Sequence, residues 1–262
     1  MNCQAGDQHM NTEGQVLKPL LCLLLALTGI ALAGVLHAAS LKILIYGGTG
    51  NIGQRIVAEA LQRGDTVTVI ARHPESSALR PAEHLHIEAG DVLDAAGVAR
   101  ALKGEDVVVS ALNSGRGTDS EGADFLLRAS QMLVNADRAL GARAPRLLIV
   151  GGAGTLEVQP GVTVLDQMRA RSGGKLDASF GPVQQKQVLD YLHTVGDVAW
   201  SYLSPSMMIE PGTRTGKFRL GGDELLTDAS GASHISMEDY AIALLDEAEH
   251  PEHLHKRFTV GY

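Results

Sequence analysis

A glycine-rich segment between an apolar run and a helical pattern constrains the fold of this chain more than any other feature. The apolar run, Lys42–Tyr46, has the composition of a buried β-strand, and residues 47–53 behind it read Gly-Gly-Thr-Gly-Asn-Ile-Gly. Gly64 stands where a helix can end in the left-handed conformation. Before it, apolar residues recur at helical spacing, namely Ile52, Ile56, Val57, Ala60 and Leu61. This order predicts the first strand, loop and helix of a parallel α/β sheet.

The glycine loop is suited to hold a pyrophosphate. Gly47 permits the tight turn, Gly50 lets the backbone approach the ligand, and Gly53 allows the helix to pack closely on the strand. The helix N-terminus then presents N–H groups and a partial positive charge to the phosphates. The alternative is a glycine-rich turn that binds nothing. The predicted phosphate site consists of Gly47, Gly48, Thr49, Gly50, Asn51, Ile52 and Gly53.

Beyond the loop, short β-rich runs alternate with helical patterns, which is typical of a parallel sheet flanked by helices. The run 107–112 is continuously apolar, as in a strand buried on both faces. We predict an α/β fold of the Rossmann type: a doubly wound parallel sheet in a single domain, residues 41–262, with a small C-terminal part facing the substrate. Strands are expected at 42–46, 66–71, 84–88, 107–112, 146–150, 199–203 and 257–260, and helices at 52–63, 125–140, 183–192 and 237–249.

The residue after the second strand indicates which dinucleotide is bound. Proteins that bind NAD usually have an acidic residue there for the ribose 2′-hydroxyl, whereas NADP binding calls for an arginine. Here Arg72 follows the strand. The guanidinium presents a fork of donors that matches phosphate oxygens. The sequence therefore favours NADP(H) over NAD(H), the alternative being a surface arginine at the strand end.

Several further segments, taken with the loop, resemble the atypical short-chain dehydrogenases/reductases, in particular the NAD(P)H-binding branch with the NADPH-dependent flavin and biliverdin reductases. The resemblance extends from Leu41 to Tyr262. The glycine loop is shared by a very large superfamily, and the later segments are more specific to the branch. The resemblance rests on 47–53, Arg72, Gly90-Asp91-Val92, Val109-Ser110-Ala111-Leu112, the 150–154 segment Val-Gly-Gly-Ala-Gly, and Leu203-Ser204-Pro205.

The resemblance implies a role for each of these segments. Asp91 and Val92 would frame the adenine. The segment Ser110, Ala111 and Leu112 would lie beneath the ribose and phosphates. All of the segments stand at carboxyl ends of strands, where open α/β sheets bind ligands. Each could instead be a helix cap or a turn, and Asp91 could form only an Asx turn. The segments that would border the nicotinamide are Gly151–Gly154, with Gly151 and Gly152 as the assigned contacts, and Ser204 with Pro205.

The acid–base pair of the standard dehydrogenases in this superfamily is missing. Those enzymes use Tyr-x-x-x-Lys, in which the lysine lowers the pKa of the tyrosine. None of the chain's five tyrosines has a lysine four residues later, and Gly151-Gly152 replaces the usual Ser/Thr after the fifth strand. Lys186 and Tyr191 are interpreted as ordinary helix-surface residues. We assign no catalytic residue, and alcohol–ketone interconversion and sugar epimerisation lose support.

Three function hypotheses remain. The first is an NAD(P)H-dependent oxidoreductase that reduces a planar flavin- or quinone-like acceptor, since the cofactor carries the hydride chemistry and water can protonate a delocalised acceptor. The second is a non-catalytic sensor that binds NADP(H) and signals its redox state. The third is an NAD(P)-dependent epimerase or isomerase that recycles the cofactor. All three predict a small-molecule partner, and the sequence indicates no oligomeric state.

The first forty residues differ from the predicted domain. An apolar run spans 20–36 after Lys18, and Ala31-Leu32-Ala33 offers a small-x-small cleavage pattern. Residues 1–40 are therefore interpreted as a secretory signal that sends the domain to the periplasm or beyond. The alternative is a membrane anchor with the domain in the cytoplasm, and this segment is the only expected membrane contact. Both cysteines, Cys3 and Cys22, lie in it, which excludes disulfides and cysteine ligands from a processed chain.

Charge and histidine content exclude two other classes of partner. The net charge of −8 argues against nucleic acid, which would require a basic face. His250, His253 and His255 precede the last strand in a proline-containing turn beside Lys256 and Arg257. Adjacent cations oppose metal binding, so this segment is interpreted as a solvated loop, and no metal site is predicted.

Overall fold

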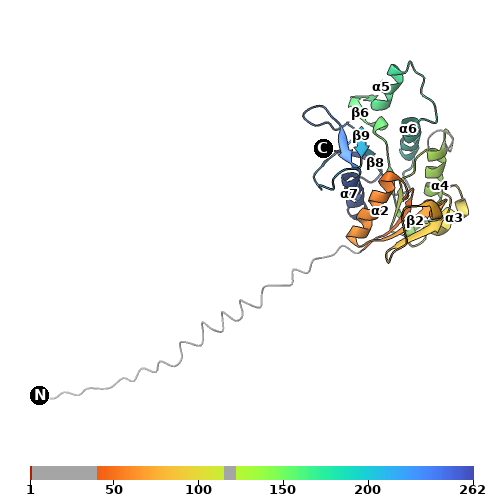
Figure 1. Cartoon of the computed structure of the whole chain (residues 1–262), viewed down its shortest axis with the longest axis vertical. Helices are drawn as coiled ribbons and strands as arrows, with labels where there is room; N and C mark the ends of the chain where they lie inside the picture. The colour runs from red at the N-terminus through yellow and green to blue at the C-terminus, as the bar shows by residue number, and fades with distance from the viewer. Residues whose placement is uncertain (2–39, 115–121) are drawn as a thin grey trace. The chain divides into compact units, whose positions relative to one another are not determined.

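The computed structural model describes residue 1 and residues 40–114 and 122–262. The chain from Ala39 to Tyr262 forms one compact unit (Figure 1). The predicted leader, apart from its first and last residues, lies outside the described residues. Within the described ranges, no helix has the length and apolar content needed to cross a bilayer.

The described part of the chain contains an eight-stranded sheet that is parallel except at one edge. The spatial order is β10-β12-β8-β5-β4-β1-β2-β3, and only β10 runs antiparallel to its neighbour. The strands are β1 Lys42–Tyr46, β2 Thr66–Ala71, β3 Leu85–Ala89, β4 Val107–Ser110, β5 Arg146–Val150, β8 Trp200–Pro205, β10 Arg219–Gly221 and β12 Lys256–Gly261. Two small sheets pair β6 Glu157–Gln159 with β7 Val162–Thr163, and β9 Met208–Glu210 with β11 His234–Ser236.

Helices cover both faces of the large sheet (Figure 1). On one face lie α2, Asn51–Arg63, and α7, Met237–Glu249, which pack on each other. On the other lie α3, Ala95–Ala101, α4, Phe125–Leu140, and α6, Gly181–Leu192. A further helix, α5, Val164–Arg171, packs on the short 3₁₀ turn η4, Ala153–Thr155. Two further 3₁₀ turns within the described residues are η1 Pro74–Ser76 and η3 Gly141–Arg143.

The alternation of side chains along β1 explains the two layers. Ile43 and Ile45 belong to the core beneath α2 and α7, whereas Leu44 and Tyr46 belong to the core beneath α3, α4 and α6. All four are almost completely buried. Because successive side chains of a strand point to opposite faces, a strand covered on both sides needs a continuous apolar run.

The predicted α/β Rossmann fold is confirmed, and the ends of several strands are corrected, among them the last, which spans Lys256–Gly261 and not 257–260. The third strand starts at Leu85, one residue later than predicted. The fourth ends at Ser110, not at residue 112, because the backbone of Ala111 lies against Gly47. The strand predicted at 199–203 spans Trp200–Pro205, since Ser204 and Pro205 still pair with β12. The left-handed end of α2 at Gly64 is confirmed by its φ of 88°.

Candidate active site

The glycine loop is a cradle of backbone in which side chains have no room. Gly47 has a φ of +81°, and a Cβ added to it would lie 2.4 Å from the carbonyl oxygen of Ala111. A Cβ on Gly53 would lie 2.1 Å from the carbonyl oxygen of Gly47, and one on Gly48 would lie 2.9 Å from both methyl groups of Val69. The turn and the close helix packing predicted for Gly47 and Gly53 are thus both present.

The N-terminus of α2 borders this cradle, and no side-chain hydrogen bond caps it. Gly50 stands at the N-cap position with no capping side chain, and the first turn contains no acidic residue. Two hydrogen bonds hold the loop: Gly50 N donates to Gly47 O at 3.0 Å, and Gln54 Nε2 donates to Thr49 O at 2.7 Å. The loop side chains themselves, Thr49, Asn51 and Ile52, are half-buried or exposed. Bare backbone and an uncapped helix start fit a pyrophosphate.

The cradle lies where the order of the sheet reverses. β1 pairs with β2 on one side and with β4 on the other. The chain therefore runs outward from β1 to β3 at the sheet's edge and then crosses back, so that β4 lies on the other side of β1. Ala111 N donates to Tyr46 O at 2.8 Å, which joins the two carboxyl ends. Ser110 is buried, and Ala111 and Leu112 are partly buried at this edge. Arg72 stands directly after β2 and is exposed. The structure therefore brings these predicted residues to one edge of the sheet.

Asp91 and Val92 follow β3 at the same edge, and both have structural partners. Asp91 Oδ1 accepts a hydrogen bond from Leu93 N at 2.8 Å, so the Asx turn considered in the sequence is present. Val92 is buried in the core beneath α3. Asp91 also lines a cavity of about 200 Å³ with Tyr46 and Arg100. Their assignment to the adenine stays a prediction.

Tyr202 fills the space that a side chain at position 151 would occupy. A Cβ on Gly151 would lie 2.2 Å from the Tyr202 ring. The Tyr202 hydroxyl lies 3.3 Å from Gly152 N, which donates to it, and 2.9 Å from Gln185 Oε1. Burial raises the pKa of Tyr202, so its hydroxyl stays protonated. The sequence gave no signal for this cluster, because its members lie on three separate elements.

The segment Ser204-Pro205 is placed differently from the prediction. Both residues lie within β8 and not behind it, because their pairing with Thr259 and Val260 continues the strand. Ser204 has no exposed surface, and its Oγ lies 3.2 Å from Thr155 Oγ1. The side chain of Ser204 is therefore part of the interior, and the assignment of the two residues to the nicotinamide stays a prediction.

A cavity of about 610 Å³ adjoins the glycines after β5, and the sequence analysis did not identify it. Gly151, Gly152 and Gly154 form one side of it. Among the described lining residues none is acidic, basic or a histidine. The only available signal was the cluster of small and apolar residues in the irregular stretch before α6. The apolar part of the lining consists of Leu126, Val164, Met168, Phe180, Pro182 and Met207, and the polar side chains are those of Asn113, Ser114, Ser179 and Gln185.

Lys186 and Tyr191 do not take part in this cavity. Lys186 Nζ forms an ion pair with Asp190 Oδ1 at 2.6 Å on the same helix. Tyr191 is partly buried against the core beneath α4 and α6. Neither residue lines the 610 Å³ cavity. The interpretation as helix-surface residues fits Lys186, whereas Tyr191 packs partly against the core.

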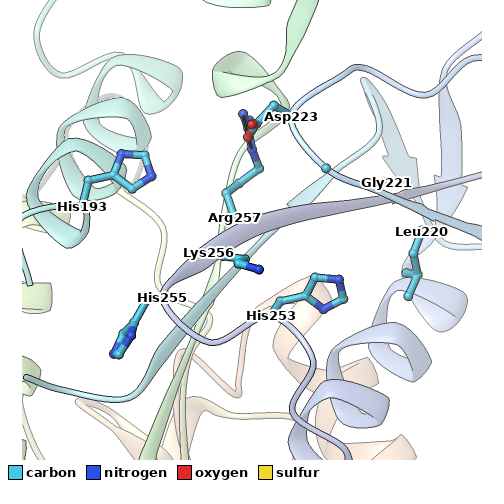
Figure 2. A pocket seen from close by; sticks show the side chains of 9 residues that line it. His193, Leu220, Gly221, Asp223, His253, His255, Lys256 and Arg257 are labelled. Carbon is cyan, nitrogen blue, oxygen red and sulfur yellow. Dashed lines mark hydrogen bonds and ion pairs between the residues drawn. The ribbon is translucent and has the colours of Figure 1, made fainter. Parts of the chain in front are cut away.

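Two of the three histidines before β12, His253 and His255 but not His250, line a second cavity of about 410 Å³ at the amino end of β12, away from the carboxyl ends that carry the glycine loop. Figure 2 shows His193, His253 and His255 spread around this pocket rather than pointing to one centre. His253 Nδ1 lies 2.8 Å from Glu247 Oε2, and its ring stacks on Phe258. The His255 ring nitrogen Nε2 lies 2.8 Å from Val198 O. Two of these imidazoles therefore have structural partners, which the prediction of a solvated loop did not foresee.

Comparison with known proteins agrees with this geometry. Among solved structures, a candidate exported protein from Burkholderia pseudomallei is 39% identical, with a TM-score of 0.70, over 85% of this chain and 100% of that one. A candidate epimerase from Bacteroides thetaiotaomicron is 35% identical, with a TM-score of 0.71, over 85% and 97% of the two chains. A candidate NADH-flavin reductase from Streptococcus pneumoniae is 29% identical, with a TM-score of 0.67, over 85% and 99%.

The family model that matches this chain is described as NAD(P)H-binding and covers residues 47–251, from the first glycine of the cradle to the turn before β12. This range contains the switch point of the sheet, the glycines after β5 and the 610 Å³ cavity. The chain therefore belongs to the NAD(P)H-binding family of atypical short-chain dehydrogenases/reductases.

Proposed function

We propose that the protein is an NADPH-dependent reductase of a planar, conjugated acceptor. The observation that carries this proposal is the 610 Å³ cavity beside the glycines after β5, whose described lining carries no charged side chain and which lies on the same sheet edge as the pyrophosphate cradle. A cavity whose described lining has no acid, base or histidine suits an acceptor that needs no dedicated proton donor. The likeness to a candidate NADH-flavin reductase supports the same class.

The residues of the cradle would hold the cofactor by its phosphates. Backbone N–H groups at the start of α2 would bind the diphosphate, with Gly47 and Gly53 keeping the approach open. Arg72, exposed at the end of β2, would contact a 2′-phosphate. Ser110, Ala111 and Leu112 would form the floor beneath the ribose and phosphates.

The chemistry divides between the cofactor and water. A bound reduced nicotinamide supplies a hydride, which carries two electrons and one proton to the acceptor. One further proton, taken from water, completes the reduction, so that NADPH, acceptor and H⁺ give NADP⁺ and the reduced acceptor. The apolar side chains of Met168, Phe180 and Met207 would keep bulk water from the face of the acceptor.

Steady oxidation of NADPH by the purified protein tests this function. We expect oxidation that depends on riboflavin, FMN or a quinone, with reduced acceptor formed in equal amount. Tight NADPH binding without turnover over the whole panel would instead indicate a sensor. Formation of an isomerised product without net NADPH loss would indicate an epimerase, the class of one relative.

The preference for NADP(H) has its own test at Arg72. Replacing Arg72 by Gln removes the cation proposed to meet the 2′-phosphate. We expect about tenfold weaker NADPH binding and unchanged NADH binding by calorimetry, because a hydrogen bond to a charged group contributes about 1.5–3 kcal/mol. Arg143→Gln, at an exposed turn far along the chain, is the matched control. Equal losses for the two cofactors would contradict the preference.

We also propose that residues 1–40 act as a secretory signal. The likeness to a candidate exported protein supports this reading over the membrane anchor. N-terminal sequencing of the protein from its own cell is expected to start near residue 34, behind the small-x-small pattern. A chain that keeps Met1 or its neighbours would contradict cleavage.

A further inference from the structure

The Gln185 side chain lies where the 610 Å³ cavity meets the end of β5. It comes from the first turns of α6 and lines the cavity together with Gly151 and Gly152. The contact with the glycine segment is close, since a Cβ on Gly152 would lie 3.1 Å from Gln185 Cγ. The Gln185 amide is therefore a polar side-chain group of this cavity that lies beside Gly152.

Two neighbours fix which way the amide faces. Gln185 Nε2 lies 3.5 Å from the carbonyl oxygen of Val150, which can only accept a hydrogen bond. Gln185 Oε1 lies 2.9 Å from the Tyr202 hydroxyl, which donates to it. The hydroxyl has one proton and two acceptors on Gln185, the backbone oxygen at 3.1 Å and Oε1 at 2.9 Å. With the proton donated to the nearer Oε1, both side-chain contacts require the same orientation of the amide. One N–H of the amide then has no partner within the described part of the chain, on a residue that lines the cavity.

Tyr202 is itself held firmly. Its ring occupies the space above Gly151, and its hydroxyl accepts from Gly152 N at 3.3 Å. The hydroxyl also lies 3.1 Å from the backbone oxygen of Gln185. Burial keeps its pKa above the ordinary value, so the hydroxyl remains a donor at neutral pH. A rigid donor on one side of an amide holds the amide in one orientation.

We propose that Gln185 donates its remaining N–H to a carbonyl oxygen or ring nitrogen of the acceptor, and that Tyr202 is the positioning residue that aims it. This inference rests on the proposed function and narrows its substrate class to conjugated rings with a hydrogen-bond acceptor on the reducible system, such as flavins and quinones. As the hydride arrives, negative charge develops on that oxygen or nitrogen before water protonates it. A preset donor at this atom stabilises the charge.

The first experiment measures binding of riboflavin to the full chain without any nicotinamide cofactor, by quenching of riboflavin fluorescence. Gln185→Met keeps the length of the side chain and removes the amide. We expect about five- to tenfold weaker binding, the loss of one hydrogen bond. Gln187→Met, the same change on the same helix outside the cavity, is the control and should bind like the wild type. A single cooperative thermal transition in each will show that both variants are folded; Gln187→Met also removes a buried amide oxygen without a partner among the described residues, so its midpoint is not expected to fall.

The second experiment reads the hydrogen bond directly and tests Tyr202. The infrared carbonyl band of bound 1,4-naphthoquinone should lie at lower frequency in the wild type and in Gln187→Met than in Gln185→Met. Tyr202→Phe leaves the amide in place but frees it to rotate. We expect its carbonyl band to broaden and to shift back toward that of Gln185→Met, an effect that a merely structural tyrosine would not produce.

The outcomes separate this inference from the proposed function. If Gln185→Met binds both probes like the wild type and the carbonyl band does not move, the inference is wrong even where NADPH is oxidised. If neither probe binds the wild type, the inference is also wrong. If the probes bind through Gln185 but no NADPH is oxidised, the inference stands and the reductase function fails.

Discussion

Single residues divide into those whose roles follow from local spacing and those whose roles depend on distant partners. Gly47 and Gly53 belong to the first group, because the turn and the helix that require them are encoded within a few residues. Tyr202 and Gln185 belong to the second. Neither stands in a motif, and their partnership with Gly152 exists only after β5, α6 and β8 have assembled.

The space around Gly53 gives a direct prediction. Gly53→Ala would place a methyl group 2.1 Å from the Gly47 carbonyl oxygen, so the loop must move. We expect the free energy of unfolding to fall by about 1–3 kcal/mol, a typical cost of overpacking, and NADPH binding to weaken. Urea titration and calorimetry measure the two effects. Gly196→Ala, which adds its methyl group to open space, is the control and should lose neither.

Asp137 gives a prediction about pH. This carboxyl on α4 is buried, and burial together with the nearby Asp197 raises its pKa to about 6. The folded state therefore holds the proton more tightly than the unfolded chain, whose value is near 3.8. The free energy of unfolding should fall as the pH rises through the window from about 4 to about 6, and should stay lower above it.

Asp137→Asn removes this dependence. We expect it to raise the free energy of unfolding by about 1 kcal/mol at pH 8, and by less than half as much at pH 4. Urea titrations at several pH values test this; the exposed Asp124→Asn at the start of the same helix, which loses an ion pair with Arg128, should instead lower the free energy of unfolding slightly at pH 8. A gain of the same size at both pH values would contradict the assignment.

The sequence predicted correctly the kind of each segment that it assigned to a helix or a strand, but it predicted their first and last residues less well. The helix Phe125–Leu140 and the strand Thr66–Ala71 follow from periodicity alone, because each buries one or both of its own faces. The end of β4 and the extension of β8 depend on neighbours. Gly47 stops the first at Ser110, and pairing with β12 carries the second to Pro205. Neither contact can be predicted from the residues next to the strand end in the sequence.

Asp239 in the first turn of α7 forms hydrogen bonds that hold the irregular segment between β9 and β10, residues 211–218, in place. Asp239 is completely buried and accepts hydrogen bonds from Thr215 N at 2.7 Å, Gly216 N at 2.9 Å and the Tyr262 hydroxyl at 2.7 Å. Burial alone would raise the pKa of Asp239, but these hydrogen bonds outweigh it and hold the pKa below its ordinary value. The stabilisation is therefore present above about pH 4 and lost as the pH falls further.

Removing this carboxylate should loosen the segment. Asp239→Ala leaves the donors of Thr215, Gly216 and Tyr262 without their acceptor. We expect the free energy of unfolding to fall by about 2–4 kcal/mol at pH 7, since buried donors lose charge-assisted bonds. Trypsin should then cut at Arg214 faster than in the wild type. Unchanged cleavage at Arg214 in a destabilised variant would show that Asp239 does not hold this segment.

At the scale of the molecule, a doubly wound parallel sheet was predictable because few arrangements satisfy a chain of alternating strands and helices, whereas the antiparallel edge strand β10 was not predicted. The 610 Å³ cavity was not predictable, since its walls come from the glycines after β5, from η4, α4, α5 and α6, and from residues scattered between Asn113 and Met207. Such a cavity results from the packing of side chains far apart in the sequence. The cofactor cradle, by contrast, is nearly contiguous in the chain.

The compactness of the unit from Ala39 to Tyr262 predicts its independence. A chain lacking residues 1–38 should unfold in urea with the same midpoint as the full chain and bind NADPH with the same affinity. Circular dichroism and calorimetry on the two chains, purified in the same detergent, make the comparison. A clear loss of stability in the shorter chain would show that the leader contributes to the folded domain.

The ring of Tyr202 also limits which side chains position 151 can accept, and so which reactions this fold can be changed to catalyse. A serine or threonine after the fifth strand is part of alcohol-oxidising sites in the superfamily, but at position 151 its Cβ would collide with that ring at 2.2 Å. Gly151→Ser alone should therefore yield a damaged protein rather than a new dehydrogenase. An evolutionary or engineered route to that chemistry has to shrink Tyr202 first, and the intermediate on that route has lost the hydroxyl that orients Gln185.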